Sequence, residues 1–343
     1  MRVLPSASPL LEIEELKKYF PLPASFWGKK SGNIRAVDGV SFALTSGKTL
    51  GLVGESGCGK STLGRTILRL YEPSGGRIRF AGRDITTVSR RELQPLRRQM
   101  QIIFQDPYSS LNPRMTVSEI LSEPLIIHQV GTAKERAQRV DQLLERVGLS
   151  AQMRGRYPHE FSGGQKQRLG IARALALSPQ LLICDEPVSA LDVSIQAQIL
   201  NLLKDLQAEL GLAYLFISHN LAVIEHSSDE VAVMYLGRIV EQAPREALFA
   251  APQHPYTKAL IAAIPLPQVA KPGSPSRQRQ VLAGDVPNPA APPQGCHFHP
   301  RCPLASERCR REAPLLRSVD GASHLAACHN ISCTLSSDLR YNH

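Results

Sequence analysis

Apolar positions alternate with polar ones in some short segments of the chain and recur with helical spacing in others. Alternation over residues 10–16 and apolar runs over residues 40–44 and 49–53 predict β-strands. Residues 61–70 then predict a helix. The pattern therefore places a glycine-rich turn between a buried strand and the start of a helix.

The middle of the chain continues this alternation of strands and helices. Further strands are predicted over residues 100–104, 181–184, 213–217 and 231–235. Helical spacing is kept by Ala137, Val140, Leu143, Leu144 and Val147, and again by Ile195, Ile199, Leu202, Leu203, Leu206 and Leu210. Because strands alternate with helices, we expect an α/β domain with an open, mostly parallel sheet that binds ligands at the carboxyl ends of its strands.

Composition limits the class of protein. With 343 residues and 43% hydrophobic content, the chain is large enough to bury a core, so disorder is not the expectation. A net charge of +10 favours anionic partners such as nucleotides, nucleic acid or lipid head groups, or simply gives a solvated basic surface. No apolar run is long enough to cross a membrane or to act as a signal peptide, so we expect a chain that stays in the cytosol.

The C-terminal part of the chain has a different composition. Prolines recur between residues 264 and 293, which favours an extended connector, and cysteines gather beyond it. These cysteines are Cys296, Cys302, Cys309, Cys328 and Cys333. In a cytosolic chain such a group indicates metal more readily than disulfides. Four thiolates suit either an iron–sulfur cluster or zinc, although tight Cys-x-x-Cys pairs are missing; unligated thiols are the alternative.

The glycine-rich turn carries the first motif with a defined chemistry. It reads Gly54-Glu55-Ser56-Gly57-Cys58-Gly59-Lys60-Ser61 and is followed by Thr62. This string fits the P-loop pattern in the strand-to-helix context that the pattern requires, so we expect it to bind ATP. The glycines let backbone N–H groups face the β-phosphate, and the helix start adds positive potential. Lys60 would reach the β- and γ-phosphates, and Ser61 would bind Mg²⁺.

Two adjacent carboxylates follow the apolar run at residues 181–184. We expect Asp185 to meet Mg²⁺, directly or through water, and Glu186 to act as the general base. Alone, such a run also describes a strand that ends at a solvated acidic turn. Its occurrence together with the phosphate motif favours the catalytic interpretation.

The string Phe161-Ser162-Gly163-Gly164-Gln165 resembles the signature of ABC ATPases. Two adjacent glycines at the start of a helix would expose N–H groups to an anion. The resemblance implies that Ser162, Gly163, Gly164 and Gln165 face the γ-phosphate bound by a partner subunit. Each nucleotide site would then be shared between two chains.

Other residues match further parts of the ABC pattern in the family's order. The resemblance implies that Gln105 approaches Mg²⁺ and the attacking water, that Asp192 in Ser189-Ala190-Leu191-Asp192 crosses a dimer interface, and that His219 contacts the γ-phosphate. Phe20, with Tyr19 as second choice, resembles the aromatic that stacks on adenine. The resemblance thus assigns catalysis to Glu186, His219 and Gln105, and Mg²⁺ binding to Ser61, Gln105 and Asp185.

Three longer strings narrow the resemblance to the ATPases of bacterial dipeptide and oligopeptide importers, a family that also includes nickel and glutathione importers. They are Tyr108-Ser109-Ser110-Leu111-Asn112-Pro113-Arg114, the run from Asp185 to Ser194, and His254-Pro255-Tyr256-Thr257-Lys258-Ala259-Leu260. In this family the C-terminal region can carry a 4Fe-4S cluster. The similar frames Gly295-Cys296-x-Phe298 and Ala327-Cys328-His329 imply such a cluster on Cys296, Cys302, Cys309 and Cys328, with Cys333 as a spare.

The resemblance also implies an organisation and partners. We expect an ABC transporter ATP-binding domain over residues 1–265 with an inserted helical subdomain at about 110–175. A Pro-rich linker over 266–294 and a Cys-rich oligopeptide-importer C-terminal region over 295–343 would follow. ATP hydrolysis in a dimeric sandwich would power import of dipeptides or oligopeptides. The expected partners are a related, non-identical second ATPase, two membrane permease subunits and, indirectly, an external peptide-binding protein, at the cytoplasmic face of the bacterial inner membrane.

Three alternatives to this function remain open or are disfavoured by the residues. The same motor could serve nickel or glutathione import. A soluble ABC ATPase acting on ribosomes or DNA would suit the basic charge, but such proteins carry two cassettes or long coiled coils, which this sequence lacks, so no nucleic-acid partner is expected. A non-catalytic subunit would be expected to lose Glu186, the signature string or His219, and all are intact.

Overall fold

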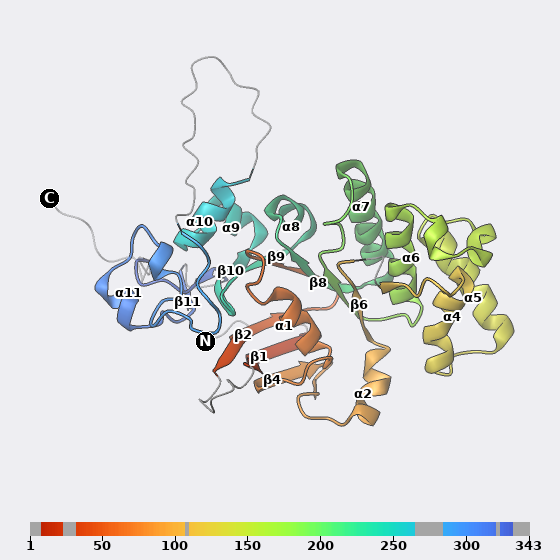
Figure 1. Cartoon of the computed structure of the whole chain (residues 1–343), viewed down its shortest axis with the longest axis horizontal. Helices are drawn as coiled ribbons and strands as arrows, with labels where there is room; N and C mark the ends of the chain where they lie inside the picture. The colour runs from red at the N-terminus through yellow and green to blue at the C-terminus, as the bar shows by residue number, and fades with distance from the viewer. Residues whose placement is uncertain (1–7, 23–31, 107–109, 265–283, 320–322, 332–343) are drawn as a thin grey trace, which may run out of the picture.

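The computed structural model describes residues 8–22, 32–106, 110–264, 284–319 and 323–331. Tyr108, Ser109 and Cys333, together with most of the predicted linker, lie outside the described residues. Within the described part, helices α4 (Val117–Ile127) and α5 (Ala133–Arg146) lie at one end of the long axis. Helix α11 (Glu307–Arg311) of the C-terminal extension, described over 284–319 and 323–331, lies at the other end (Figure 1).

The main sheet has the strand order β11-β12-β10-β9-β3-β8-β7-β6. Its strands are β3 (Thr49–Val53), β6 (Met100–Ile103), β7 (Leu181–Asp185), β8 (Ala213–Ser218), β9 (Glu230–Tyr235), β10 (Arg238–Pro244), β11 (Arg317–Ser318) and β12 (Leu325–Ala326). The strands from β9 to β6 are mutually parallel, which confirms the predicted α/β sheet. The strands β10, β12 and β11 extend it antiparallel.

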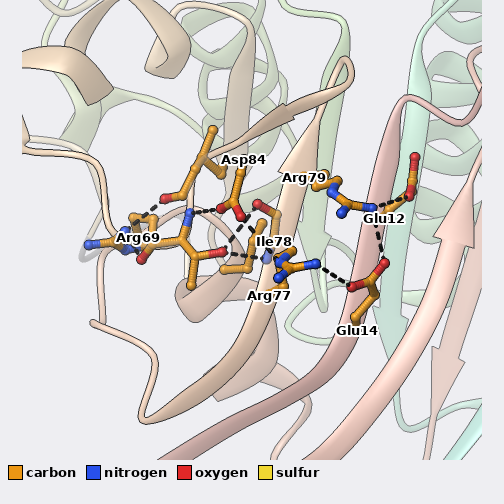
Figure 2. A network of polar contacts seen from close by, with 9 residues as sticks. Glu12, Glu14, Arg69, Arg77, Ile78, Arg79 and Asp84 are labelled. Carbon is orange, nitrogen blue, oxygen red and sulfur yellow. Dashed lines mark hydrogen bonds and ion pairs between the residues drawn. The ribbon is translucent and has the colours of Figure 1, made fainter.

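A second, antiparallel sheet has the order β2-β1-β4-β5. Its strands are β1 (Leu11–Pro21), β2 (Asn33–Leu44), β4 (Gly75–Phe80) and β5 (Arg83–Asp84). Figure 2 shows polar contacts across it: Arg77 pairs with Glu14 at 3.4 Å, and Arg79 lies 3.1 Å from Glu14 and 3.5 Å from Glu12. These side chains are partly exposed, so the pairs add little stability individually. The opposite face supplies buried apolar side chains such as Ile78 and Phe80.

Alternate residues of the parallel strands belong to two separate cores. In β7, Leu182 and Cys184 pack with the helical subdomain, whereas Leu181 and Ile183 pack with the antiparallel sheet. This division follows from the period-2 alternation of side chains across a strand. The near-continuous apolar sequence of β3, β7 and β8 is therefore explained by burial on both faces.

Helices cover the main sheet and form the subdomain. They are α1 (Lys60–Ile67), α2 (Arg90–Arg97), α6 (Gly163–Leu175), α7 (Val193–Leu210), α8 (Leu221–Ser227), α9 (Arg245–Ala250) and α10 (Pro255–Ala262), with 3₁₀ turns η1 (Ala151–Gly155), η2 (Pro158–Glu160) and η3 (His299–Arg301). Capping boxes begin α4 at Thr116 and α5 at Thr132. None of the helices in the described residues is long and apolar enough to cross a membrane.

Candidate functional site

The phosphate loop, residues 54–61, connects β3 to α1 and is packed too tightly for larger residues at two positions. A Cβ atom on Gly59, where φ is +107°, would lie 1.9 Å from the carbonyl oxygen of Ala36. A Cβ atom on Gly54 would lie 2.2 Å from the carbonyl oxygen of Met234. The neighbouring strands therefore fix the path of the loop and require glycine at both positions.

Lys60 points back into this loop. Its ammonium group donates to the carbonyl oxygens of Gly54 at 2.7 Å and Glu55 at 3.0 Å, and the residue is only 5% exposed. Burial raises the pKa of the adjacent Cys58 thiol, so this thiol stays neutral. Lys60 thus supplies positive charge at the centre of the loop, where an anion would be bound.

Ser61 and Asp185, which the sequence analysis assigns to Mg²⁺, lie side by side. The Ser61 hydroxyl donates to Asp185 Oδ1 at 2.7 Å. Burial raises the pKa of Asp185, whose Oδ2 atom is buried and has no hydrogen-bond partner. A buried carboxylate oxygen without a partner next to a hydroxyl fits Mg²⁺, which prefers hard oxygen ligands.

Glu186 is held by two polar side chains from neighbouring strands. Gln105 Nε2 donates to Glu186 Oε2 at 3.0 Å, and His219 Nδ1 lies 3.1 Å from the same oxygen. Gln105 follows β6, Glu186 follows β7 and His219 follows β8, so the carboxyl ends of adjacent parallel strands bring them together. Glu186 has φ +49°, a left-handed conformation that is costly for glutamate and that concentrates at functional sites.

A cavity of about 380 Å³ opens over the phosphate loop. Phe20, Gln105 and Glu186 line it together with the loop from Ser56 to Thr62. Sequence reasoning missed the remaining lining residues, which are Ile34, Arg35, Ala36, Leu236, Gly237 and Pro289. These come from β2, from the turn between β9 and β10 and from the C-terminal extension, and they share no motif.

The two aromatic candidates for the adenine face occupy different surroundings. Phe20 lines the cavity over the phosphate loop and packs edge-to-face against Tyr71 at 5.4 Å between ring centroids. Tyr19 instead donates to Asp38 and lines a neighbouring cavity. Burial, followed by the bond to Asp38, raises the pKa of Tyr19 to about 12.

The signature loop caps α6 but is not part of this cavity. Ser162 Oγ accepts from the Gln165 N–H at 3.3 Å, and Gln165 Oε1 accepts from the Ser162 N–H at 3.0 Å. Gly163 and Gly164 begin α6, while Asp192 lies at the N-terminal end of α7. None of these residues lines the cavity of about 380 Å³ over the phosphate loop.

The predicted iron–sulfur cluster is wrong. Throughout the described ranges, no group of three or more His, Cys, Asp or Glu side chains is placed to hold a metal ion. Cys296 and Cys302 pack against the hydrophobic core, and burial raises the pKa of Cys296 to about 11, which keeps it a neutral thiol. Cys309 Sγ contacts Ser306 Oγ at 3.3 Å, and Cys328 Sγ accepts from the Asn330 N–H at 3.4 Å. Family resemblance and clustering were thus insufficient to establish a cluster on these four cysteines.

Two family models match the chain. Residues 37–189 match the model described as "ABC transporter", which is not an iron–sulfur family, and residues 240–309 match "Oligopeptide/dipeptide transporter, C-terminal region". The oligopeptide transport ATP-binding protein AppF of Bacillus subtilis is 53% identical over 321 residues, covering 93% of this chain and 97% of AppF. The probable peptide ABC transporter ATP-binding protein y4tS of Sinorhizobium fredii is 55% identical, covering 93% and 89% respectively.

Solved structures give the same likeness. The dimeric ATP-binding cassette MJ0796, in a post-hydrolysis state bound to ADP and Pi, superimposes with a TM-score of 0.61 at 27% identity. The match covers 68% of this chain and 98% of MJ0796. The structure of cbiO1 from Clostridium perfringens, part of the ABC transporter complex cbiONQ, gives a TM-score of 0.60 at 30% identity, covering 71% of this chain and 91% of cbiO1.

Proposed function

The chain belongs to the family of ABC transporter ATP-binding proteins and is an ABC-type ATPase, and we propose that it powers the import of dipeptides or oligopeptides. The carrying observation is the convergence of Gln105 and His219 on Glu186 at the cavity over the phosphate loop. A base held by two polar side chains beside a phosphate-binding loop is suited to the hydrolysis of a phosphoanhydride.

We assign ATP to this cavity. The phosphate loop and Thr62 would hold the phosphates, with Lys60 exchanging its bonds to the loop carbonyls for bonds to phosphate oxygens. Phe20 would stack on the adenine. Ser61, Asp185 and Gln105 would hold Mg²⁺, which neutralises charge on the β- and γ-phosphates when bound.

Glu186 would take the proton of the attacking water. Its Oε2 atom already accepts from Gln105, which orients the carboxylate toward the cavity. His219 lies on the same oxygen and is half exposed, so it is available to a γ-phosphate that enters the site. The chain's own residues thus position the water, accept its proton and contact the departing phosphate.

The sites are completed by a second chain. The signature loop forms the start of α6, with Ser162 as the cap residue followed by Gly163, Gly164 and Gln165, and none of the four lines the cavity. Asp192 caps α7 and does not line the cavity either. Helix starts attract anions, so we assign this loop to the nucleotide held by a partner ATPase. The dimeric state of MJ0796 supports this assembly. Because importers of this kind commonly use two different ATPases, a related, non-identical partner is proposed.

The remaining partners follow from the importer role. We propose docking on two membrane permease subunits at the cytoplasmic face of a bacterial inner membrane, with an external peptide-binding protein delivering the solute. The names of AppF and y4tS, an oligopeptide and a peptide transport protein, support this solute class. The match of residues 240–309 to an oligopeptide/dipeptide transporter region supports it further.

Uptake in a strain that lacks this chain tests the proposal. Radiolabelled dipeptides and tripeptides should enter only when the strain is complemented with the wild-type chain, and the Glu186→Gln variant should not restore uptake. Import by an unrelated ABC system serves as the control. Normal peptide uptake combined with failure of nickel or glutathione import would overturn the peptide assignment and leave the motor role in place.

A further inference from the structure

Arg301 of the C-terminal extension contacts the phosphate loop directly. Its two terminal nitrogens donate to Glu55 Oε2 and Oε1 at 2.7 and 3.0 Å. Such a paired contact of guanidinium and carboxylate fixes orientation as well as charge. The Arg301 side chain is only 6% exposed, so the contact is largely shielded from solvent.

A single 3₁₀ turn holds Arg301 in place. Phe298 precedes η3 and Arg301 ends it, and side chains three residues apart in a 3₁₀ turn project to the same side. Phe298 is 1% exposed, and its ring centroid lies 5.3 Å from that of Tyr235 and 5.4 Å from that of Tyr256. The Arg301 guanidinium also lies over the Tyr235 ring at 5.9 Å. The extension therefore presents a preorganised guanidinium to the loop.

Glu55 joins this anchor to Lys60. The Glu55 N–H donates to the Tyr256 hydroxyl at 2.9 Å, and its carbonyl oxygen accepts from Lys60 at 3.0 Å. One residue thus binds the extension through its side chain, α10 through its amide and the lysine of the phosphate loop through its carbonyl. A rotation of Glu55 would displace a carbonyl group that positions Lys60.

Charge gives Arg301 a second role. The cavity is lined from Ser56 to Thr62, whereas Glu55 is not among its lining residues, because its carboxylate is turned toward Arg301. An unpaired carboxylate this close to the phosphate site would repel a bound triphosphate. Arg301 neutralises this carboxylate and keeps it out of the cavity.

We propose that Arg301 is a positioning residue for nucleotide binding, through which the C-terminal extension sets the geometry and the charge of the phosphate loop. The inference rests on the proposed assignment of ATP to this cavity. It assigns a role in nucleotide binding to the C-terminal extension, which lies outside the phosphate loop, the signature string and the Asp185-Glu186 pair. Arg301 acts through Glu55 and does not touch the nucleotide itself.

Nucleotide binding by the full-length chain tests this proposal. Calorimetric titration with ADP and with ATP should give a Kd about tenfold higher for Arg301→Met, because the Glu55 carboxylate would lose its charged partner beside the phosphate site. Arg301→Lys should recover part of the affinity because it keeps the charge but loses the paired geometry. In the steady state, the KM for ATP should rise by a similar factor while kcat changes less than about twofold.

The double variant Glu55→Gln/Arg301→Met separates positioning from folding. Removing the repelling carboxylate should bring its Kd back toward the wild-type value, which mere loss of packing could not do. Arg311→Met, which removes an exposed pair with Glu307 in the same extension, should bind nucleotide like the wild type.

Three results would overturn the inference. A wild-type Kd in Arg301→Met would do so, as would a double variant as weak as the single one, or a Kd for Arg301→Lys no better than for Arg301→Met in folded protein. A wild-type chain that binds no nucleotide would instead refute the proposed function. Far-UV circular dichroism identifies any variant that fails to fold, and Arg301→Lys then carries the test.

Discussion

The contacts that hold Lys60 in the phosphate loop join residues close in sequence, whereas those that hold the C-terminal extension to the rest of the chain join residues far apart in sequence. Lys60 binds carbonyl groups of its own loop, whereas Phe298 and Arg301 contact residues of β9 and the phosphate loop. Likewise His324 binds Glu241 of β10 at 2.7 Å. The bonds of Lys60 thus stay within one short string of sequence, whereas the contacts of the extension depend on the tertiary fold.

The largest expected effect is on the chemistry at the strand ends. Glu186→Gln removes the general base and should slow ATP turnover on the order of 10² to 10⁴, the usual range for such a group. ADP binding should be unchanged, because the phosphate loop is untouched. Phosphate release from saturating ATP measures turnover, and calorimetric titration of ADP is the control. Turnover near the wild-type rate would remove Glu186 from this role.

Loss of a contact that holds the C-terminal extension should instead lower the free energy of unfolding of the protein. Glu241 is fully buried and accepts from the Gln253 N–H at 2.7 Å, the His254 N–H at 2.8 Å and His324. Removing this carboxylate would leave buried donors without a partner, at a cost of about 1–3 kcal/mol each, so Glu241→Ala should lower the free energy of unfolding by at least this amount. Urea unfolding measures it.

A matched carboxylate in the same region gives the control for that experiment. Glu312 forms an exposed pair with Arg308, four residues before it, so Glu312→Ala should leave the urea midpoint unchanged. Equal midpoints for the Glu241 and Glu312 variants would show that the buried network does not hold the extension.

Substitutions of the two aromatic residues of β1 test which of them stacks on the adenine at the cavity, which the phosphate loop and Pro289 of the C-terminal extension both line. Phe20→Ala should raise the Kd for ATP about tenfold, since stacking on a base contributes about 1–3 kcal/mol. Tyr19→Phe, which loses only the hydroxyl bonded to Asp38, should bind like the wild type. A normal Kd for Phe20→Ala together with weak binding by Tyr19→Ala would move the adenine face to Tyr19.

The smallest expected effect is a dependence of stability on pH. Burial lowers the pKa of His254 to about 3, below the value of about 6.5 expected in the unfolded chain. Between these values the unfolded state binds more protons, so stability falls as the pH falls, by about 1.4 kcal/mol per pH unit.

His254→Asn keeps a side-chain acceptor for the Tyr256 N–H and cannot titrate. Urea unfolding at pH 7 and pH 5.5 should therefore show a smaller loss of stability for this variant than for the wild type. His159→Asn, at an exposed position, should keep the wild-type slope. Parallel curves for His254→Asn and the wild type would refute the assignment.

The strands and helices of the parallel sheet could be predicted because burial on both faces leaves continuous apolar runs at β3, β7 and β8. Glu186 could be proposed from the carboxylate pair after the apolar run of β7, whereas the roles of Gln105 and His219 came from the resemblance to the ABC pattern. By contrast, β4 and β5 escaped prediction because they are short: the alternation of β4 extends only from Arg77 to Phe80, and β5 has two residues.

Other features depended on distance in the sequence. Arg301 and Glu55 are separated by 246 positions, and no local pattern links them. The cysteines led to an error of the opposite kind, because a site was predicted there that the described part of the chain does not form. Their clustering along the chain and a family resemblance led to a predicted metal site, whereas in the fold Cys296 and Cys302 are half-buried and pack against the apolar core.

The pairing of β12 with β10 also protects the edge of the main sheet. Glu241 faces Ala326 and Gln242 faces Leu325 across this ladder, and the Ala327 N–H donates to the Val240 carbonyl at 2.8 Å. A truncated form that ended after α10 would leave the N–H and C=O groups along the outer edge of β10 unpaired. It would also remove Phe298 from the rings of Tyr235 and Tyr256, which are buried in the full chain. Open strand edges next to apolar surface recruit other chains, so such a fragment is expected to aggregate.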